Sequence, residues 1–289
     1  MSVAHVQTKR EIAEALASVG MRPRKMFGQN FLIDGNLMRR LVAAAALTEH
    51  DLAIEVGAGT GGLTDLLVAS AGQVVSVEID RDLQRIVAER FRGHDGFRLI
   101  CGDVLERKHE IIGSLAEAIV THDDRRGAVK LVANLPYQIA TPLVMNLLVD
   151  YPQVRAFVFT VQAEVGDRVT AEAGCKAYGP LAIIAQVLAD VATVARLGPG
   201  AFWPRPTIRS VMLKLEVKPS PFADVDTLRR FAALVRGVFE HRRKTLRAAM
   251  RLHNHAVACA ALFEQVDATR RPESLTPSEW VALFERYDA

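Results

Sequence analysis

The chain has few cysteines and no long apolar run, and both deficits narrow the classes of protein to which it can belong. Its 289 residues include three cysteines, Cys101, Cys175 and Cys259, which lie far apart and form no C-x-x-C pair. Such a set predicts neither a disulfide framework nor a zinc site and is typical of a reducing cytoplasm. No segment approaches the ~20 apolar residues that span a bilayer, and residues 1–20 contain no signal-peptide core. We therefore expect a cytoplasmic protein that binds neither a metal nor a membrane.

A strong net charge is also lacking, although the basic residues are clustered. The net charge is +3 at pH 7 and the isoelectric point is about 8.8. Weak net charge with local basic patches favours a polyanionic partner over a membrane. The stretch His241–Arg251 holds five Arg and Lys residues and no acid. We interpret it as a helix that contacts phosphates, in preference to a solvated helix face.

A second basic segment lies near the amino terminus, at Met21–Asp34. Two phenylalanines, Phe27 and Phe31, are interleaved with its basic residues. The segment is equally consistent with an extension anchored to the core by these rings and with an arm whose Gln29 and Asn30 side chains touch a ligand.

Apolar runs that predict strands recur along most of the chain. They are residues 52–56, 74–78, 97–101, 130–133, 156–161, 191–197 and 210–217. Helical patterns alternate with them from residue 52 to 197, which predicts an α/β fold with a mostly parallel sheet and helices on both faces. The short connection before the last strand predicts that this strand is antiparallel. Only helical patterns follow the linker Lys218–Pro221, so we expect domains at 1–217 and 218–289.

A glycine-rich loop follows the first of these strands and precedes a helix. Glycines permit positive φ and let a ligand approach the backbone closely. Read as G-x-G-x-x-G, through Gly57, Gly59 and Gly62, the loop matches the dinucleotide-binding fingerprint. Read as E-x-G-x-G-x-G, from Glu55 to Gly61, it resembles the first motif of S-adenosylmethionine-dependent methyltransferases. The loop alone does not choose between these readings, or exclude a purely structural turn.

Polar residues end the later strands. Glu78, about 20 residues beyond the glycine loop, is placed to accept the hydroxyl protons of a ribose. Asp103 follows the third strand and could accept a hydrogen bond from an exocyclic amine, whereas Asp80 reads as a helix cap. In parallel sheets ligands bind at the carboxyl ends of the strands, where Gly57, Glu78, Asp103 and Asn134 all fall.

The fourth strand runs directly into Asn134-Leu-Pro-Tyr137. This sequence places an amide, two carbonyls and an aromatic ring together at a strand end. These groups could hold a flat ring that forms hydrogen bonds, although the stretch alone is also compatible with a proline-stopped turn. The other polar residues expected at this edge favour the ligand-binding interpretation.

A set of motifs occurs in order along the chain. They are Phe27-Gly-Gln-Asn-Phe-Leu32, Glu55–Gly61, Asn134–Tyr137, Gln162-x-Glu164, Tyr178-Gly179, Phe202-x-Pro-x-Pro206 with Ser210, and Arg242-Arg-Lys-Thr245. The ordered set closely resembles the small-subunit ribosomal RNA adenine N6,N6-dimethyltransferases, the kasugamycin-sensitivity family, over residues 21 to 285. The resemblance implies a Rossmann-like class I methyltransferase domain, a small helical carboxyl-terminal domain that binds RNA or the ribosome, and S-adenosylmethionine as the cofactor.

The resemblance also implies roles for residues that bind the cofactor. Glu78 would hold the ribose hydroxyls, Asp103 the adenine amine, and Asn134 would bridge cofactor and target. The full set of expected cofactor contacts is Asn30, Leu32, Gly57, Gly59, Glu78, Asp103 and Asn134.

The expected reaction is in-line methyl transfer to adenine N6. The Asn134 side-chain oxygen and the Leu135 carbonyl would accept the two N6 hydrogens, with Pro136 fixing their geometry. Tyr137 would stack on one face of the base, and Phe202 is the candidate for the other face. We expect no general base to act before the attack.

By resemblance, the target is a pair of adjacent adenosines in the 3′-terminal hairpin loop of small-subunit RNA, within a partly assembled subunit. A monomer suffices for this reaction. The expected RNA contacts are Arg22, Arg24, Lys25, Arg242, Arg243, Lys244 and Arg247. The alternatives are a large-subunit RNA adenine methyltransferase and an assembly or transcription factor that retains the fold.

The chain departs from the family pattern at a few places. Ala163 and Thr207 stand where lysines are common, Pro180 follows Tyr-Gly, and the stretch between Asp103 and Lys130 is longer than usual. None of these positions belongs to the expected chemistry, and the loss of two lysines is expected to weaken or relocate RNA contacts.

Overall fold

A computed structural model describes residues 5–23, 29–123, 127–253, 263–264 and 266–288. The chain divides into two compact units. The first contains Met1–Leu147, Gln153–Gly166 and Ala192–Glu216, and the second contains Leu148–Pro152, Asp167–Val191 and Val217–Ala289. Each unit is described below by itself.

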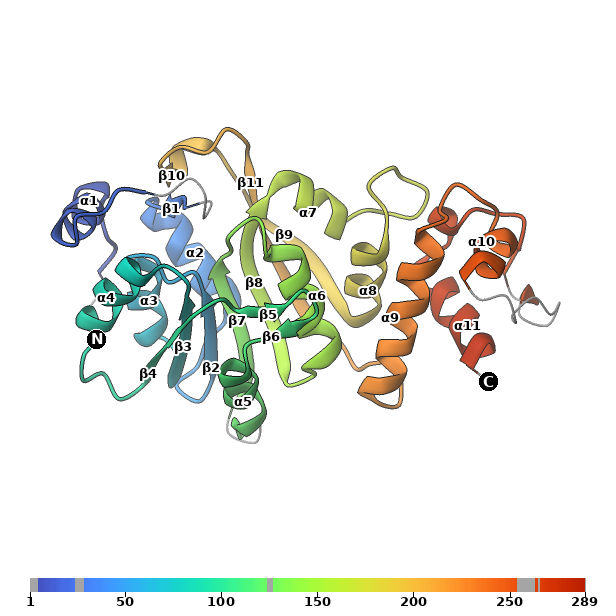
Figure 1. Ribbon diagram of the computed structural model, residues 1–289, viewed down its shortest axis with the longest axis horizontal. Coiled ribbons are helices and arrows are strands. Elements are labelled where there is room, and N and C mark those ends of the chain that lie inside the picture. The colour runs from blue at the N-terminus through green and yellow to red at the C-terminus, as the bar shows by residue number, and fades with distance from the viewer. Residues whose placement is uncertain (1–4, 24–28, 124–126, 254–262, 265, 289) are drawn as a thin grey trace. The chain divides into compact units, whose positions relative to one another are not determined.

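A seven-stranded sheet forms the centre of the first unit (Figure 1), and its strand order is β4-β3-β2-β7-β8-β11-β9. Its strands are β2 (Leu52–Val56), β3 (Gln73–Glu78), β4 (Phe97–Cys101), β7 (Val129–Asn134), β8 (Val154–Gln162), β9 (Ala189–Leu197) and β11 (Ser210–Val217). The pairs β2–β3, β3–β4, β2–β7 and β7–β8 are parallel, and β11 is antiparallel to β8. The predicted α/β fold, with its mostly parallel sheet and antiparallel last strand, is confirmed.

Helices connect the strands as the alternating pattern predicts. Those before residue 170 are α1 (Lys9–Ser18), α2 (Gly35–Ala45), α3 (Gly62–Val68), α4 (Arg81–Arg90), α5 (Gly113–Thr121), α6 (Ala140–Asp150) and α7 (Ala163–Val169). Helices α2 and α3 pack together on one face of the sheet, and α5 and α6 lie on the opposite face (Figure 1). The predicted cap is present, because Asp80 accepts hydrogen bonds from the backbone N–H groups of Asp82 and Leu83 at the start of α4.

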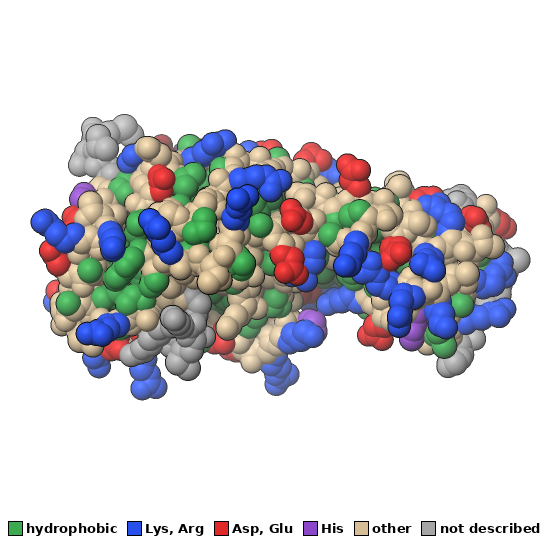
Figure 2. Space-filling view, turned by 90° about the horizontal axis from the view of Figure 1, so that it is seen from above, with side chains coloured by type: hydrophobic (Ala, Val, Ile, Leu, Met, Phe, Trp, Pro, Cys, Tyr) green, Lys and Arg blue, Asp and Glu red, His purple; other side chains and the backbone are tan. Residues whose placement is uncertain are grey.

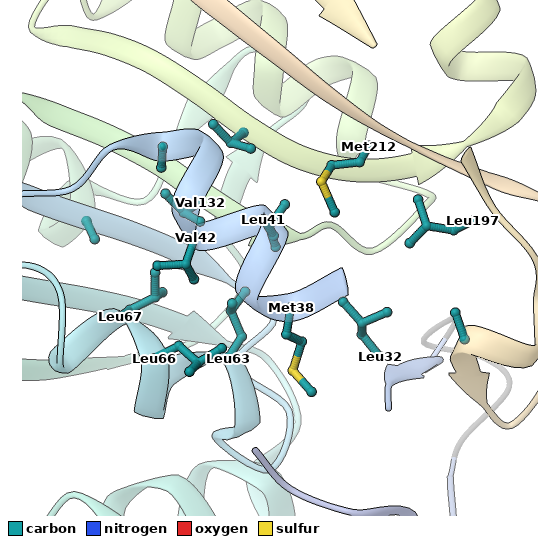
Figure 3. Packing of buried hydrophobic residues seen from close by; sticks show 14 of the residues in the cluster. Leu32, Met38, Leu41, Val42, Leu63, Leu66, Leu67, Val132, Leu197 and Met212 are labelled. Carbon is teal, nitrogen blue, oxygen red and sulfur yellow. The ribbon is translucent and has the colours of Figure 1, made fainter. Parts of the chain in front are cut away.

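The main core of this unit lies between α2, α3 and the sheet. In Figure 3, Leu41 and Val42 of α2 and Leu66 and Leu67 of α3 gather over Val132 of β7. Each residue is at most 9 % exposed. This packing fixes the strand ends, and therefore the polar residues that follow them, relative to one another.

Two small sheets were not predicted. Strand β1 (Phe31–Leu32) pairs with β10 (Phe202–Trp203), and β5 (Leu105–Arg107) forms a hairpin with β6 (Glu110–Ile111). The sequence pattern predicts a helix from residue 106, which is wrong, since the helix α5 begins only at Gly113. The polar residues of the hairpin carry no strand-like alternation, so the pattern does not reveal it.

The second unit contains α8 (Pro180–Leu188), α9 (Val225–Phe239), α10 (Leu246–His253) and α11 (Pro277–Asp288), with a 3₁₀ turn at Pro272–Ser274. An aromatic core packs α9 against α11. Its rings are Tyr178, Phe222, Phe231, Phe239, Trp280 and Phe284. The sequence Thr276-Pro-Ser-Glu279 predicts a capping box, and it is present at the start of α11, where Thr276 N–H donates to Glu279 at 2.8 Å and Glu279 N–H donates to the Thr276 hydroxyl at 3.3 Å.

Charge is distributed over the surface without a single dominant patch on the face shown in Figure 2. Lys and Arg side chains are spread across this face, with Asp and Glu side chains between them. The interactions of each basic side chain are therefore a better guide to RNA contacts than the overall charge.

Candidate active site

A cavity of about 320 Å³ opens at the carboxyl ends of β2, β3, β4 and β7. Pockets of this size and larger hold small ligands and cofactors. Most residues that the sequence singles out for cofactor and base binding line it together. They are Asn30, Leu32, Gly57, Gly59, Glu78, Asp103, Asn134, Leu135, Pro136 and Tyr137.

The glycine loop forms one wall of the cavity. Gly57 and Gly59 have φ of +82° and +60°, a conformation that favours glycine. A Cβ at Gly57 would lie 3.2 Å from Pro136 Cγ, and one at Gly59 would lie 3.1 Å from Phe31 Cε1. Side chains at these positions would fill space beside the cavity, so the glycines keep the backbone open to a ligand.

Glu78, at the end of β3, is held by the backbone and is almost completely buried. One carboxylate oxygen accepts from Gly59 N–H at 2.9 Å, and the other accepts from Asp80 N–H at 3.0 Å. Burial raises the pKa of this carboxyl group, although the N–H donors oppose the shift. Each oxygen retains a further lone pair for a hydroxyl group. The side chain thus provides fixed acceptor positions at the cavity wall.

Glu55, in β2, is buried beneath the same cavity. One oxygen accepts from the Thr64 hydroxyl at 2.7 Å and the Ser76 hydroxyl at 2.5 Å. The other oxygen, Oε1, is buried and has no hydrogen-bond partner among the described residues. Burial raises the pKa of Glu55 to about 7. A buried acceptor without a partner carries a free-energy cost that a polar or cationic ligand in the cavity would relieve.

Asp103 is exposed at the cavity rim, in the turn after β4. Its carboxylate accepts from Leu105 N–H at 2.9 Å, as in an ordinary aspartate turn. The turn does not exclude a ligand, because the carboxylate has further acceptor positions. Asp103 therefore lies at the rim of the cavity, and its hydrogen bond to the backbone fixes its direction.

Asn134 lies at the last position of β7, with its side-chain amide held at both ends. The amide nitrogen donates to the Asn30 carbonyl at 3.0 Å, and the amide oxygen accepts from the Thr160 hydroxyl. The oxygen keeps one more acceptor position. Asn134 thereby joins the amino-terminal arm, which carries expected cofactor contacts, to the Asn134–Tyr137 turn.

Tyr137 is half-buried at the cavity and is tethered by its hydroxyl group, which lies 2.8 Å from the Ser210 hydroxyl. Burial raises the pKa of Tyr137, so the phenol remains neutral at physiological pH. Ser210, a member of the sequence motif set, therefore holds the ring of a candidate base-stacking residue.

Phe202 does not occupy the position expected of a second stacking face. It is 1 % exposed, packs in the core between α2 and the sheet, and does not line the cavity. The structure therefore does not bring Phe202 to the cavity beside Tyr137. The pairing of β10 with β1 places Phe202 opposite Leu32 and turns its side chain into the core.

Sequence reasoning misses the contribution of the amino-terminal segment before residue 20. Gln7 and Ile12 line the cavity, and both are buried. The Gln7 amide donates to the Thr60 carbonyl at 3.1 Å and accepts from the Thr60 hydroxyl at 2.6 Å. No motif marks these residues, because their placement depends on how α1 packs. The other lining residues without a predicted role include Ile79, Leu83, Val104, Gln138 and Ile139.

The basic residues expected to bind RNA differ in their surroundings. The run around Arg242–Lys244 forms a turn between α9 and α10, so the prediction of one continuous helix is wrong; only Arg247 and Arg251 lie on α10. Arg242 is engaged within the second unit by Glu273, at 2.8 Å, whereas Arg243 and Lys244 are exposed. Arg22 is also exposed, in the first unit. The expected contacts Arg24 and Lys25, like Phe27, lie outside the described residues.

In the described ranges, no three His, Cys, Asp or Glu side chains are grouped as ligands of one metal ion. In the same ranges, the structure contains no helix with the length and apolar character needed to cross a membrane.

A family model described as ribosomal RNA adenine dimethylase matches residues 20–289. The chain belongs to the ribosomal RNA adenine dimethylase family. The predicted family is confirmed, and with it the enzyme class, an rRNA adenine dimethyltransferase that uses S-adenosylmethionine.

Relatives match over nearly their whole length. A protein from Moorella thermoacetica named ribosomal RNA small subunit methyltransferase A is 37% identical, with 91% of this chain and 92% of the relative covered. A protein of the same name from Geobacillus thermodenitrificans is 35% identical, with 96% and 95% covered.

Solved structures show the same fold. A dimethyladenosine transferase from Plasmodium falciparum has a TM-score of 0.71 at 25% identity, covering 89% of this chain and 97% of that one. The 23S rRNA methyltransferase ErmE has a TM-score of 0.65 at 24% identity, covering 90% and 100%. The predicted class I methyltransferase fold is confirmed.

Members of this family require S-adenosylmethionine, and the cavity fits it. The glycine loop leaves the backbone open, Glu78 offers acceptors suited to ribose hydroxyls, and the unpartnered oxygen of Glu55 is suited to a cationic or donor group. These features are observed in the chain itself and agree with the cofactor that the family uses.

Proposed function

We propose that this chain transfers methyl groups to N6 of two adjacent adenosines in the 3′-terminal hairpin loop of small-subunit ribosomal RNA, giving N6,N6-dimethyladenosine during subunit biogenesis. One observation carries the proposal: a single cavity brings the acids expected to hold an adenosine cofactor next to the Asn134–Tyr137 turn. The names of the relatives from Moorella thermoacetica and Geobacillus thermodenitrificans support a small-subunit target.

The chemistry required of the protein is positioning. S-adenosylmethionine, when bound, supplies a methyl group that is already activated by the sulfonium centre. Adenine N6 is a poor nucleophile, because its lone pair is delocalised into the ring. In the first transfer the Asn134 side-chain oxygen and the Leu135 carbonyl accept its two hydrogens, hold the amine pyramidal, and stabilise the positive charge that develops on N6. The C–N bond would form as the methyl–sulfur bond breaks, and the proton that N6 then loses would pass to water. In the second transfer one hydrogen remains to be accepted.

The target base must also be held flat against the protein. Tyr137 provides the stacking ring, and its hydrogen bond to Ser210 fixes the ring in place. The adenosine must first leave its stack, at a cost of a few kcal/mol that is smallest in a loop. A hairpin-loop adenosine therefore suits this site better than one in a duplex.

We assign contact with the RNA backbone to Arg22, Arg243, Lys244 and Arg247, with the helical domain at 218–289 as the main ribosome-binding element. The exposure of these four side chains supports this assignment. Arg242 serves the turn instead, since its guanidinium is paired with Glu273. The substrate is a partly assembled small subunit in the cytoplasm, and the enzyme acts as a monomer.

A transfer assay tests this function. Protein and methyl-labelled cofactor are incubated with small subunits lacking the modification, with large subunits as the control, and the labelled nucleosides are identified. We expect label in N6,N6-dimethyladenosine from the two loop positions of the small subunit. Label confined to large-subunit RNA would establish the large-subunit alternative. An absence of label with protein that binds cofactor would favour an assembly factor that retains the fold.

A further inference from the structure

The Asn134 amide is the group on which the proposed reaction depends, and two elements distant in sequence hold it. The Asn30 carbonyl, in the amino-terminal arm, accepts from the amide nitrogen at 3.0 Å. On the other side, Asn134 and Thr160 are register partners on the adjacent strands β7 and β8, and the Thr160 hydroxyl donates to the amide oxygen.

These two contacts have different consequences. A carbonyl can only accept, so Asn30 determines which end of the Asn134 amide is the nitrogen. If the amide were flipped, the Asn134 side-chain oxygen would face the Asn30 carbonyl oxygen with no proton between them. A hydroxyl can donate or accept, so Thr160 does not choose the orientation but adapts to it by donating. Thr160 fixes the plane of the amide, because a group held at both ends cannot rotate about its terminal torsion.

The surroundings of Thr160 are apolar, so its hydroxyl group needs a hydrogen-bond partner. It is fully buried in β8, and the strand is otherwise apolar around it, with Val158 and Val161 also fully buried. On the side away from β7 its register partner is Met212 of β11. A buried hydroxyl is costly unless it is hydrogen-bonded, and the bond to Asn134 satisfies it.

We propose that Thr160 is a positioning residue for methyl transfer, which holds the Asn134 amide oxygen toward the target amine without touching the substrate. The proposal rests on the proposed function, because it assigns Asn134 the role of accepting an N6 hydrogen. The Thr160 hydroxyl occupies one acceptor position of the oxygen and leaves the other for the amine. The target nitrogen thus meets an acceptor of fixed direction.

Two substitutions separate the hydroxyl from the packing. Thr160→Val has nearly the same shape and suits a strand, but it lacks the hydroxyl. Thr160→Ser keeps the hydroxyl and loses only a methyl group. Single-turnover transfer rates at saturating cofactor and RNA are measured for both variants and for the wild type. The dissociation constant of S-adenosylhomocysteine and the melting temperature are measured alongside.

We expect Thr160→Val to lower the transfer rate about tenfold, the equivalent of one net hydrogen bond. Cofactor affinity should stay within about twofold and the melting temperature within about 3 °C of wild type. Thr160→Ser should recover most of the rate. A wild-type rate in Thr160→Val, or equal losses in both variants, would overturn the proposal. If the wild type itself transferred no methyl group to adenine N6, the proposed function would fail first, which is a separate result.

Discussion

The two ends of the central strands both bury acids, but the acids have opposite surroundings. At the amino ends, Asp51 accepts from the Lys130 ammonium at 2.8 Å and from Ala128 N–H at 2.7 Å. At the carboxyl ends, Glu78 is held by backbone N–H groups only, and Glu55 by hydroxyl groups with one oxygen unpartnered among the described residues. The acid at the amino ends is paired with a cation, whereas the acids at the carboxyl ends face a cavity.

The pKa values follow this difference. Burial alone would raise the pKa of Asp51, but Lys130 and the backbone donors outweigh burial and lower it. Burial raises the pKa of both Glu78 and Glu55, because no cation among the described residues compensates for it. At the amino end the backbone is also closely packed, since a Cβ at Gly127 would lie 2.1 Å from the His50 carbonyl oxygen. A buried acid with a cation partner thus maintains the fold, whereas one without a cation that faces a cavity is a candidate ligand-binding group.

The largest expected effect is on chemistry at the carboxyl end. Asn134→Ala should lower the methyl transfer rate about 100-fold or more, because the amine loses an acceptor that the reaction requires. Binding of S-adenosylhomocysteine, measured by calorimetry, should weaken by much less. Equal losses of rate and of affinity would make Asn134 a cofactor ligand only.

Cofactor binding should depend most strongly on Glu78. Glu78→Gln should raise the dissociation constant of S-adenosylmethionine about 10- to 100-fold, since hydrogen bonds to a charged acceptor are replaced by weaker ones. Calorimetry is again the measurement. Asp95→Asn, at an exposed acid away from the cavity, is the control and should bind as the wild type does. Unchanged affinity in Glu78→Gln would remove this residue from the cofactor site.

Substitutions at the amino ends of the strands should change stability but not cofactor affinity. Lys130→Met leaves Asp51 buried without its cation and should lower the free energy of unfolding by about 3 kcal/mol, with cofactor affinity unchanged. Lys214→Met removes an ion pair to the exposed Glu216 and should cost less than about 1 kcal/mol.

The pH dependence of stability provides a second test of the Asp51–Lys130 pair. Because the pKa of folded Asp51 is lowered, its stabilising contribution is present above about pH 4 and is lost as the pH falls through the folded value. In Lys130→Met the pKa of folded Asp51 should be lowered less, so the loss of stability on acidification should be smaller. Denaturant titrations at a series of pH values check this, and identical acid profiles in both proteins would contradict it.

The last effect concerns the stability contribution of Glu55, which should have the opposite pH slope. Its folded pKa of about 7 exceeds the ordinary value of 4.5, so the folded state holds a proton that the unfolded state has lost between these values. Its contribution to stability therefore falls as the pH rises from about 4.5 to 7, by at most about 3 kcal/mol. Glu55→Gln, which does not titrate, should flatten this slope in urea unfolding. A slope that persists in the variant would assign the effect to another group.

The sequence predicts the arrangement at the carboxyl end because parallel strands end at one edge. The strand patterns place Gly57, Glu78, Asp103 and Asn134 there, and all four line the cavity. Each of these residues is of a type that is uncommon directly after an apolar run. That signal is local, so it survives without knowledge of the tertiary structure.

Features that depend on packing between distant segments are not predicted. Gln7 carries no motif, and its place beside Thr60 depends on how the amino-terminal segment docks. Thr160 resembles any strand-forming residue until its pairing with Asn134 is known. The core position of Phe202 is not predicted either, because its aromatic ring suggests stacking while the β1–β10 pairing buries it.

Hydrogen–deuterium exchange with and without S-adenosylmethionine tests the central claim most directly, since it compares both ends of the strands in one experiment. The account predicts slower exchange on cofactor binding in residues 57–64 and 78–82, where the N–H groups of Gly59 and Asp80 contact Glu78. Residues 48–52 and 128–130, around Asp51, should exchange at unchanged rates. Protection that appears around Asp51, or that is absent from the glycine loop, would contradict the assignment of the carboxyl end as the cofactor site.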